Sequence, residues 1–162
     1  MSERNQETIR RLYDGLDRSD GEAMAACYAP DATFSDPVFP VLEGSEVGDM
    51  WRMLTERSTD LRVELAEHST SPDSGQAHWI ATYTFRAGRT VVNDVRAEFR
   101  FAADGRIYTH RDSFDLWKWS RQALGPIGLA LGWSPIVRNK IRAEAADGLE
   151  RFRAERAAAG SA

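Results

Sequence analysis

The stretch "FSDPVFP", residues 34–40, holds one carboxylate, Asp36, between apolar and proline residues. Aspartate in such a setting often forms a turn, because its side chain accepts hydrogen bonds from nearby backbone N–H groups. A carboxylate held at the mouth of an apolar pocket has a raised pKa instead, and it can transfer a proton. The sequence leaves both roles open for Asp36.

A second pair of titratable side chains lies in "IYTHRDSFDL", residues 107–116. Because side chains alternate along a strand, this stretch predicts that Tyr108, His110, Asp112 and Phe114 share one face. If that face is interior, His110 and Asp112 need hydrogen-bond partners, and their pKa values shift. We therefore predict Asp36, His110 and Asp112 as catalytic residues. The alternative is that His110 and Asp112 are satisfied residues of the core.

The hydrophobic period predicts the elements that position these residues. Helical spacing indicates helices over 3–16, 22–29 and 46–57, the second stopped by Pro30 and the third capped by Ser45. A short strand, 31–36, leads into the Asp36 loop. Alternation and turn residues then predict four longer strands, and these cover residues 61–68, 76–86, 89–101 and 107–116. Helix returns over 117–125 and again after Ser134–Pro135.

This order predicts one α+β domain over residues 1–162. A strongly curved antiparallel sheet would wrap around the N-terminal helices and leave an apolar cone with an open mouth. We expect the core of the domain at about 3–117 and a helical extension at about 117–158.

The residues predicted to line the cone are mostly aromatic. In the strand 89–101, Asn93 and Phe99 fall on the apolar face, opposite a ladder of charged side chains expected to face solvent. The pattern does not decide which face of strand 77–86 is internal. The predicted ligand-binding set is Tyr13, Phe34, Trp51, Asn93, Phe99 and Tyr108.

Composition narrows the classes of function. The net charge of the 162 residues is -4 with acids and bases mixed, which predicts no nucleic-acid partner and no membrane partner. A single cysteine, Cys27, excludes an internal disulfide and favours a cytoplasmic protein. Three scattered histidines and the lack of a phosphate-binding glycine loop predict no metal and no cofactor.

The stretch "LWKWSRQALGPIGLALGWSPIVRNKIR", residues 116–142, is rich in tryptophan and leucine. It would either close the open cone as a lid or pack in the core or between subunits. The sequence leaves these alternatives open.

The run "YAPDATFSDP", with the glycine and aromatic-bearing helix that follow it, resembles the NTF2-like superfamily over about residues 8–117. That superfamily includes ketosteroid isomerases, SnoaL-type polyketide cyclases and limonene epoxide hydrolase. The resemblance implies a cone-shaped α+β fold, a ligand cavity and a homodimer formed through the outer face of the sheet.

The resemblance also suggests roles for individual residues. Asp36 falls on the general base of ketosteroid isomerases, whereas the positions of their two oxyanion donors fall on Leu12, beside Tyr13, and on Ala97. "HRDSFDL" is similar to the limonene epoxide hydrolase motif, in which Asp112 matches a catalytic aspartate, but "HWIATYTF" lacks the partner Arg-x-Asp.

Two functions follow as hypotheses. The chain binds a small hydrophobic molecule and acts as a cofactor-independent isomerase, lyase or cyclase that uses Asp36. Alternatively, it is a non-catalytic binding or dimeric interaction module.

Overall fold

The computed structural model describes residues 2–161, including all side chains in that range except those of residues 2 and 87. The predicted domain ends, 1 and 162, lie outside this range. The helices are α1 (Ser2–Asp17), α2 (Gly21–Ala25), α3 (Ser45–Arg57), α4 (Leu116–Leu124), α5 (Pro126–Leu131) and α6 (Pro135–Gly160). The strands are β1 (Tyr28–Ser35), β2 (Leu42–Glu43), β3 (Arg62–Thr70), β4 (Ser74–Phe85), β5 (Arg89–Phe101) and β6 (Ile107–Ser113), with a 3-10 turn, η1 (Arg86–Gly88), between β4 and β5.

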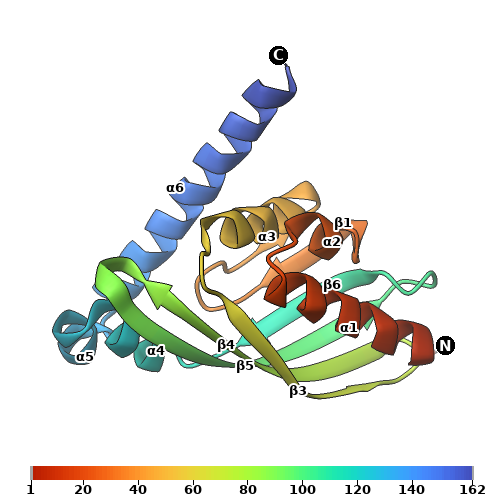
Figure 1. Cartoon of the computed structure of the whole chain (residues 1–162), viewed down its shortest axis with the longest axis horizontal. Helices are drawn as coiled ribbons and strands as arrows, with labels where there is room; N and C mark the ends of the chain where they lie inside the picture. Colours follow the sequence, from red (N-terminus) through yellow and green to blue (C-terminus); the bar gives the residue numbers. More distant parts are fainter. Residues whose placement is uncertain (1, 162) are drawn as a thin grey trace.

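The strands form one six-stranded sheet in the order β2-β1-β6-β5-β4-β3. Helices α1, α2 and α3 lie over one face of this curved sheet (Figure 1). The predicted α+β architecture is confirmed. The sheet is not purely antiparallel, because the meander β3–β6 returns the chain beside β1 in the same direction, so that β1 and β6 pair in parallel.

The core lies between the concave face of the sheet and helices α1 and α3, a region called the cone interior below. The predicted apolar stripe of α1 is buried there, and it comprises Ile9, Leu12, Tyr13 and Leu16. The sheet contributes Val91, Val95, Ala97 and Phe99 from β5. The apolar face of β5 is therefore the interior face, and its charged side chains are exposed.

The start of the chain departs from prediction at two places. Helix α2 ends at Ala25, and β1 already begins at Tyr28. Pro30 is accommodated because the β1–β6 register is interrupted between Tyr28 and Thr33, where the missing N–H breaks no ladder. Ser45 does not cap α3: Gly44 precedes the helix with φ 59 and provides no side-chain cap.

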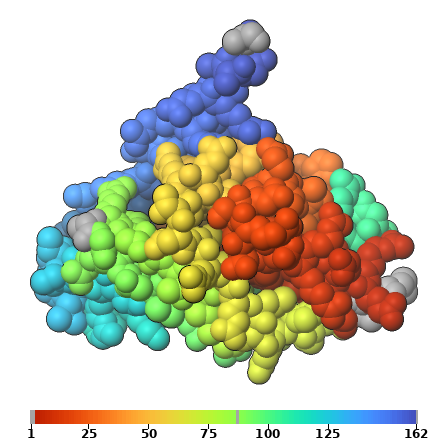
Figure 2. All heavy atoms as spheres, viewed as in Figure 1, coloured from red at the N-terminus to blue at the C-terminus, as the bar shows by residue number. Residues whose placement is uncertain are grey.

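The C-terminal helices form one end of the molecule. The Ser134 side chain accepts a hydrogen bond from Ile136 N at 3.2 Å, and Pro135 opens the 26-residue α6, as predicted. Helix α6 leaves α4 and α5, passes α3 and projects beyond the body (Figures 1 and 2). Among residues 2–161, no helix is long and apolar enough to cross a bilayer.

Candidate functional site

The Asp36 loop joins β1 to β2 and is closed by the aspartate itself. Asp36 N donates to Phe39 O at 2.8 Å, while Asp36 Oδ1 accepts from Val38 N at 2.7 Å and from Phe39 N at 2.6 Å. Among the described residues, Oδ2 of Asp36 accepts no such bond. One carboxylate oxygen therefore holds the turn, and the other is available to exchange a proton.

The surroundings of Asp36 favour its neutral form. Burial is the largest effect and raises the pKa of Asp36 to about 6, with the negative charge of Asp112 raising it further. The two backbone hydrogen bonds and His110 act in the opposite direction. The pKa of this carboxyl lies near the range that suits a general base at neutral pH.

A chain of hydrogen bonds crosses the cone interior from α3 to β6. Trp51 Nε1 donates to the Tyr28 hydroxyl at 2.8 Å. Tyr28 Oη and His110 Nδ1 lie 2.7 Å apart, and His110 Nε2 lies 2.8 Å from Asp112 Oδ1. His110 is fully buried and Asp112 is 4% exposed, so the whole chain is shielded from water.

The donors in this chain set the direction of its protons. The indole of Trp51 can only donate, so the Tyr28 oxygen accepts that bond and its own proton points to His110 Nδ1. His110 then carries its proton on Nε2 and donates it to Asp112. Phe34 and Phe99 pack on the imidazole, with ring centroids 4.9 Å and 4.4 Å away. The network fixes the orientation of the Asp112 carboxylate.

Two further polar atoms are buried in the cone without a protein partner, the hydroxyl of Tyr13 and Nε1 of Trp79. The two rings lie 5.2 Å apart between their centroids. Burial, and next the charge of Asp112, raise the pKa of Tyr13, so its hydroxyl stays protonated and remains a donor. Buried donors without partners are rare in proteins and are typical of sites that receive a ligand.

Most of the predicted site residues meet in this region. His110, Asp112, Tyr13, Phe34, Trp51 and Phe99 are buried together, Asp36 is half-buried beside them, and Asn93 is half-buried on the interior face of β5. The placement of Tyr108 on the same face is wrong. Arg100 pairs with Thr109 and Phe101 with Ile107, so Tyr108 is the extra residue of a β-bulge and is 44% exposed.

Other residues of the site are not apparent from the sequence. The pattern places Tyr28 at the end of a helix, although it starts β1 and joins Trp51 to His110. Trp79 belongs to the strand whose faces the pattern does not distinguish. In the structure Ala77, Trp79 and Ala81 form the buried face of β4, and His78 faces outward and pairs with Asp94. The apolar residues at every second position of β4 are compatible with this face, but they do not select it.

The C-terminal helices contact the rim of the cone near Asp36. Trp119 Nε1 of α4 donates to the Tyr83 hydroxyl at 2.7 Å, and the charge of Asp36 contributes to raising the pKa of Tyr83. Arg142 Nε of α6 donates to Pro37 O, the residue after Asp36, at 2.9 Å. Helices α4 and α6 therefore cover the side of the cone on which Asp36 lies.

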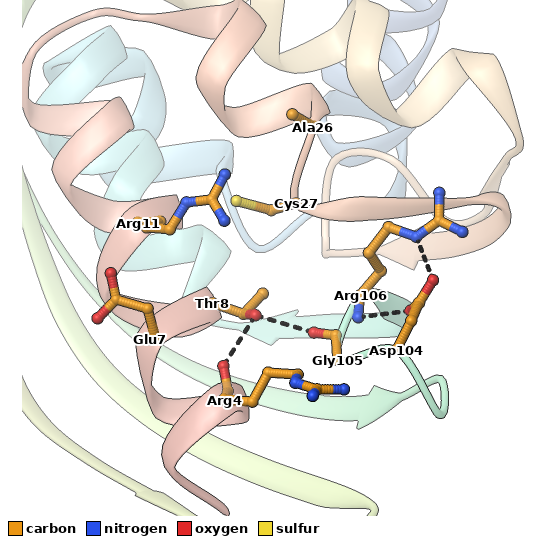
Figure 3. A pocket seen from close by; sticks show the side chains of 9 residues that line it. All are labelled: Arg4, Glu7, Thr8, Arg11, Ala26, Cys27, Asp104, Gly105 and Arg106. Atoms are coloured by element: carbon orange, nitrogen blue, oxygen red, sulfur yellow. Dashed lines mark hydrogen bonds and ion pairs between the residues drawn. The ribbon is translucent and has the colours of Figure 1, made fainter. Parts of the chain in front are cut away.

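Two surface pockets lie away from these residues. One of about 300 Å³ lies between α1 and the β5–β6 turn, where Arg106 pairs with Asp104 and Arg11 points toward Cys27 (Figure 3). The other, about 810 Å³, lies between η1, α4 and α5. Neither is lined by Asp36, His110 or Asp112. Within residues 2–161, no cluster of three or more potential ligands suits a metal ion.

Comparison with solved structures relates this geometry to known folds. The structure is similar to a hypothetical protein with a ketosteroid isomerase-like fold from Catenulispora acidiphila, in complex with trimethylamine; the TM-score is 0.65 at 15% identity, over 74% of this chain and 94% of that one. An LEH-like epoxide hydrolase from M. tuberculosis has a TM-score of 0.65 at 17% identity, over 80% of this chain and 96% of that one.

A third solved structure is the epoxide hydrolase/cyclase-like enzyme SalBIII, which has a role in pyran ring formation in polyether salinomycin. Its TM-score is 0.62 at 17% identity, and the alignment covers 70% of this chain and 92% of that one. At such identities these structures are evidence for the fold alone. No curated protein matches the sequence.

The sequence itself matches a family model described as a SnoaL-like domain over residues 9–110, which is more than half of the chain. The helices that cover a curved six-stranded sheet agree with that match. The chain therefore belongs to the SnoaL-like family and has the NTF2-like fold shared by ketosteroid isomerase-like proteins.

Proposed function

We propose that the cone interior binds a small, largely apolar molecule that carries an oxygen acceptor such as a carbonyl. The observation that carries this proposal is the pair of buried donors without protein partners, Tyr13 Oη and Trp79 Nε1, in the same interior as two carboxylates. A carbonyl oxygen would satisfy these donors, and apolar groups would pack against the surrounding rings.

We further propose that the site is a cofactor-independent acid–base catalyst of the isomerase, lyase or cyclase type. Asp36 would take a proton from the carbon next to the carbonyl and return it at another position or to a leaving or closing group. With a pKa of about 6, Asp36 is about nine-tenths ionised at pH 7, so it is ready to act as a base.

The other polar groups would have distinct roles in that reaction. As the proton leaves carbon, negative charge develops on the substrate oxygen, where the Tyr13 hydroxyl can stabilise it. The Tyr13 proton is retained because burial and Asp112 raise the pKa of Tyr13. Asp112, oriented by His110, keeps the pKa of Asp36 high through like-charge repulsion.

Epoxide hydrolysis is less well supported by this interior. Asp112 is bonded to His110, and no arginine is bonded to it among the described residues. The buried positions of β4, where the resemblance would place an Arg-x-Asp pair, are Ala77, Trp79 and Ala81.

Hydrogen–deuterium exchange into a bound ketone would test the proposal for any substrate of this chemical class. The full chain is incubated in D2O with any co-purified ligand and with a panel of apolar ketones, and proton NMR follows the signals next to the carbonyl. We expect exchange that Asp36→Asn slows by about 100-fold or more while binding persists. Asp31→Asn, at an exposed position of β1, is the matched control.

Each result of this experiment has a distinct meaning. Binding without exchange in the unaltered chain would favour the non-catalytic binding module. Exchange that is equally fast in Asp36→Asn would remove Asp36 from the role of base. Absence of any bound ketone would overturn the proposal for the cone interior.

Pairing of two copies through the outer sheet face, which the family resemblance implies, is a separate part of this proposal. The exposed ladder Asp94, Arg96, Glu98 and Arg100 supports it, because opposite charges on one face can match those of a second copy. Light scattering of the unaltered chain and of Arg96→Glu would test it: a dimer that dissociates in the variant is the expected result, and a monomer in both would contradict it.

A further inference from the structure

One end of the molecule exposes an unusual amount of apolar surface. Ten large hydrophobic side chains are exposed among the described residues, and six of them lie between residues 117 and 136. The six are Trp117, Ile127, Leu129, Leu131, Trp133 and Ile136, with exposed fractions that reach 65% at Trp133 and 81% at Ile136. They lie on α4, α5 and the start of α6, at the end of the molecule opposite the N-terminus (Figures 1 and 2). Clustered exposure of this kind marks a surface that meets something other than water.

The same segment is purely cationic. Residues 116–143 contain Lys118, Arg121, Arg138, Lys140 and Arg142 and no aspartate or glutamate, although the whole chain has a net charge of -4. All of these cations except Arg142 are exposed. The even mixture of charges in the whole composition therefore does not hold for this end.

A groove of about 810 Å³ lies beside the apolar side chains. Arg89 and Arg121 contribute to its lining, together with Gln122 and Leu129. The Arg121 guanidinium also lies 4.7 Å from the centroid of the Trp117 ring. Cations, a tryptophan and aliphatic side chains are therefore adjacent on α4 and α5.

We propose that this surface, formed by α4, α5 and the first turns of α6, docks onto an anionic lipid bilayer. Exposed aliphatic and tryptophan side chains can enter the boundary between headgroups and acyl chains, while neighbouring lysines and arginines bind the anionic headgroups. Neither feature alone would select a lipid surface, because an apolar patch also suits proteins and cations also suit free anions. The combination, without any acid in the segment, is complementary to an anionic membrane.

A second copy of the chain fits this surface less well. A two-fold symmetric contact would bring the cations of residues 116–143 close to the same cations of the other copy, with no acid from this segment to pair them. The buried side of α4, formed by Leu116, Ser120 and Ala123, already packs against the body, so the exposed side chains are not needed for folding.

The proposal goes beyond the acid–base function and gives the position of the cone on the membrane. Trp119 of α4 and Arg142 of α6 contact the rim near Asp36, through Tyr83 and the Pro37 carbonyl. Docking through these helices would hold that rim close to the bilayer surface. The ligands reaching it would then be lipophilic molecules dissolved in the membrane.

Co-sedimentation with lipid vesicles tests the proposal independently of any activity. The full chain is mixed with vesicles of phosphatidylcholine alone and of phosphatidylcholine with phosphatidylglycerol. We expect binding to the vesicles that contain phosphatidylglycerol, weaker binding to phosphatidylcholine, and release by added salt.

Two double variants separate the apolar and the charged contributions. Arg138→Gln with Lys140→Gln should weaken binding by about 25-fold, at about fivefold per cation. Trp133→Ser with Ile136→Ser should weaken it by about tenfold or more. The matched controls lie at exposed positions elsewhere, Val41→Ser for the apolar change and Arg10→Gln with Arg62→Gln for the charges, and they should bind as the unaltered chain does.

Circular dichroism of each variant verifies that the fold is retained. The proposal is overturned if anionic vesicles do not bind the chain, if pure phosphatidylcholine binds it equally well, or if both double variants bind as the controls do. Self-association that disappears in Trp133→Ser with Ile136→Ser, without vesicle binding, would assign the surface to a second copy instead.

Discussion

Asp36 combines two roles that the sequence alone could not separate. Its Oδ1 closes the loop after β1 by accepting from Val38 N and Phe39 N, as a turn-forming aspartate does. Its burial beside Asp112 raises the pKa of the same carboxyl to about 6, as expected of a proton-transfer group. The turn holds the carboxylate in place, so the structural role supports the chemical one.

The raised pKa of Asp36 predicts a measurable cost in stability. The usual pKa is 3.8, so between that pH and about 6 the folded state binds more protons than the unfolded state. The free energy of unfolding therefore falls as pH rises through this window, and above it the full cost remains. Asp36→Asn keeps the Oδ1 acceptor but removes the charge, so we expect it to be more stable at pH 7.5 by about 1–3 kcal/mol.

Urea unfolding of both proteins at pH 4 and pH 7.5 measures this difference. The gain of Asp36→Asn over the unaltered chain should be small at pH 4 and near its maximum at pH 7.5. Asp31→Asn, where the carboxylate is exposed, should show no such pH-dependent gain. A gain that is equal at both pH values would mean that the charge of Asp36 is not the cause.

At the scale of the elements, parallel pairing of β1 with β6 assembles the buried network. It brings Phe34 beside His110 and places Tyr28 opposite Ile107 at the start of β6. Helix α3 adds Trp51, and α1 adds Tyr13 from the other side. Helix α4 then covers the rim through Trp119, which packs on Phe85 with ring centroids 5.3 Å apart and bonds to Tyr83.

If α4 shields Asp36 from water, shortening Trp119 should lower the pKa of Asp36. Burial is the largest cause of the raised pKa, and Trp119→Ala would admit water beside Tyr83, whose pKa responds to the charge of Asp36. We expect the pKa to fall from about 6 toward the usual 3.8, as measured by carbon-13 NMR of the side-chain carboxyl.

The control for this experiment is Trp133→Ala, since Trp133 is 65% exposed and its indole bonds only to Ala130 O of the preceding helix among the described residues. It should leave the titration of Asp36 unchanged. A pKa that stays near 6 in Trp119→Ala would show that the β1–β2 loop alone buries Asp36.

At the scale of the whole molecule, a single buried carboxylate attaches the projecting helix α6 to the body. Asp49 of α3 is 8% exposed and binds Arg52 NH1 at 3.0 Å, Arg153 Nε at 3.1 Å and Arg156 Nε at 3.5 Å. Arg153 and Arg156 both lie on α6. The division into a core of about 3–117 and an extension of about 117–158 stays a prediction, and this contact is the place to test it.

Asp49→Asn should loosen α6 from α3, because the amide keeps one acceptor but loses the charge shared by three guanidinium groups. We expect a loss of about 1–3 kcal/mol in stability and faster hydrogen exchange over residues 147–158. Exchange in β5 and β6 should change much less if the extension opens independently of the core. Glu150→Gln, at an exposed position of α6, is the control.

Exchange that accelerates uniformly across α6, β5 and β6 would contradict an independent extension. It would show that the helix and the sheet unfold as one cooperative unit.

The sequence by itself determined the local features of this protein. Helical spacing identifies the buried stripe of α1, and alternation identifies the interior face of β5 with Asn93 and Phe99, because both periods follow directly from backbone geometry. Local chemistry likewise predicts the Ser134–Pro135 start of α6 and the hairpin after β4. The run around Asp36 also suffices to indicate the family.

Only the tertiary structure decided what depends on contacts between distant segments. The local pattern predicts a helix at Tyr28, yet pairing with β6 draws this residue into a strand, and it predicts an interior Tyr108, yet a bulge turns that side chain outward. Alternation within β4 could not select a face, since that choice depends on which side α1 covers. The orphaned hydroxyl of Tyr13 and the raised pKa of Asp36 arise from burial by residues far away in the chain, and no local pattern records that.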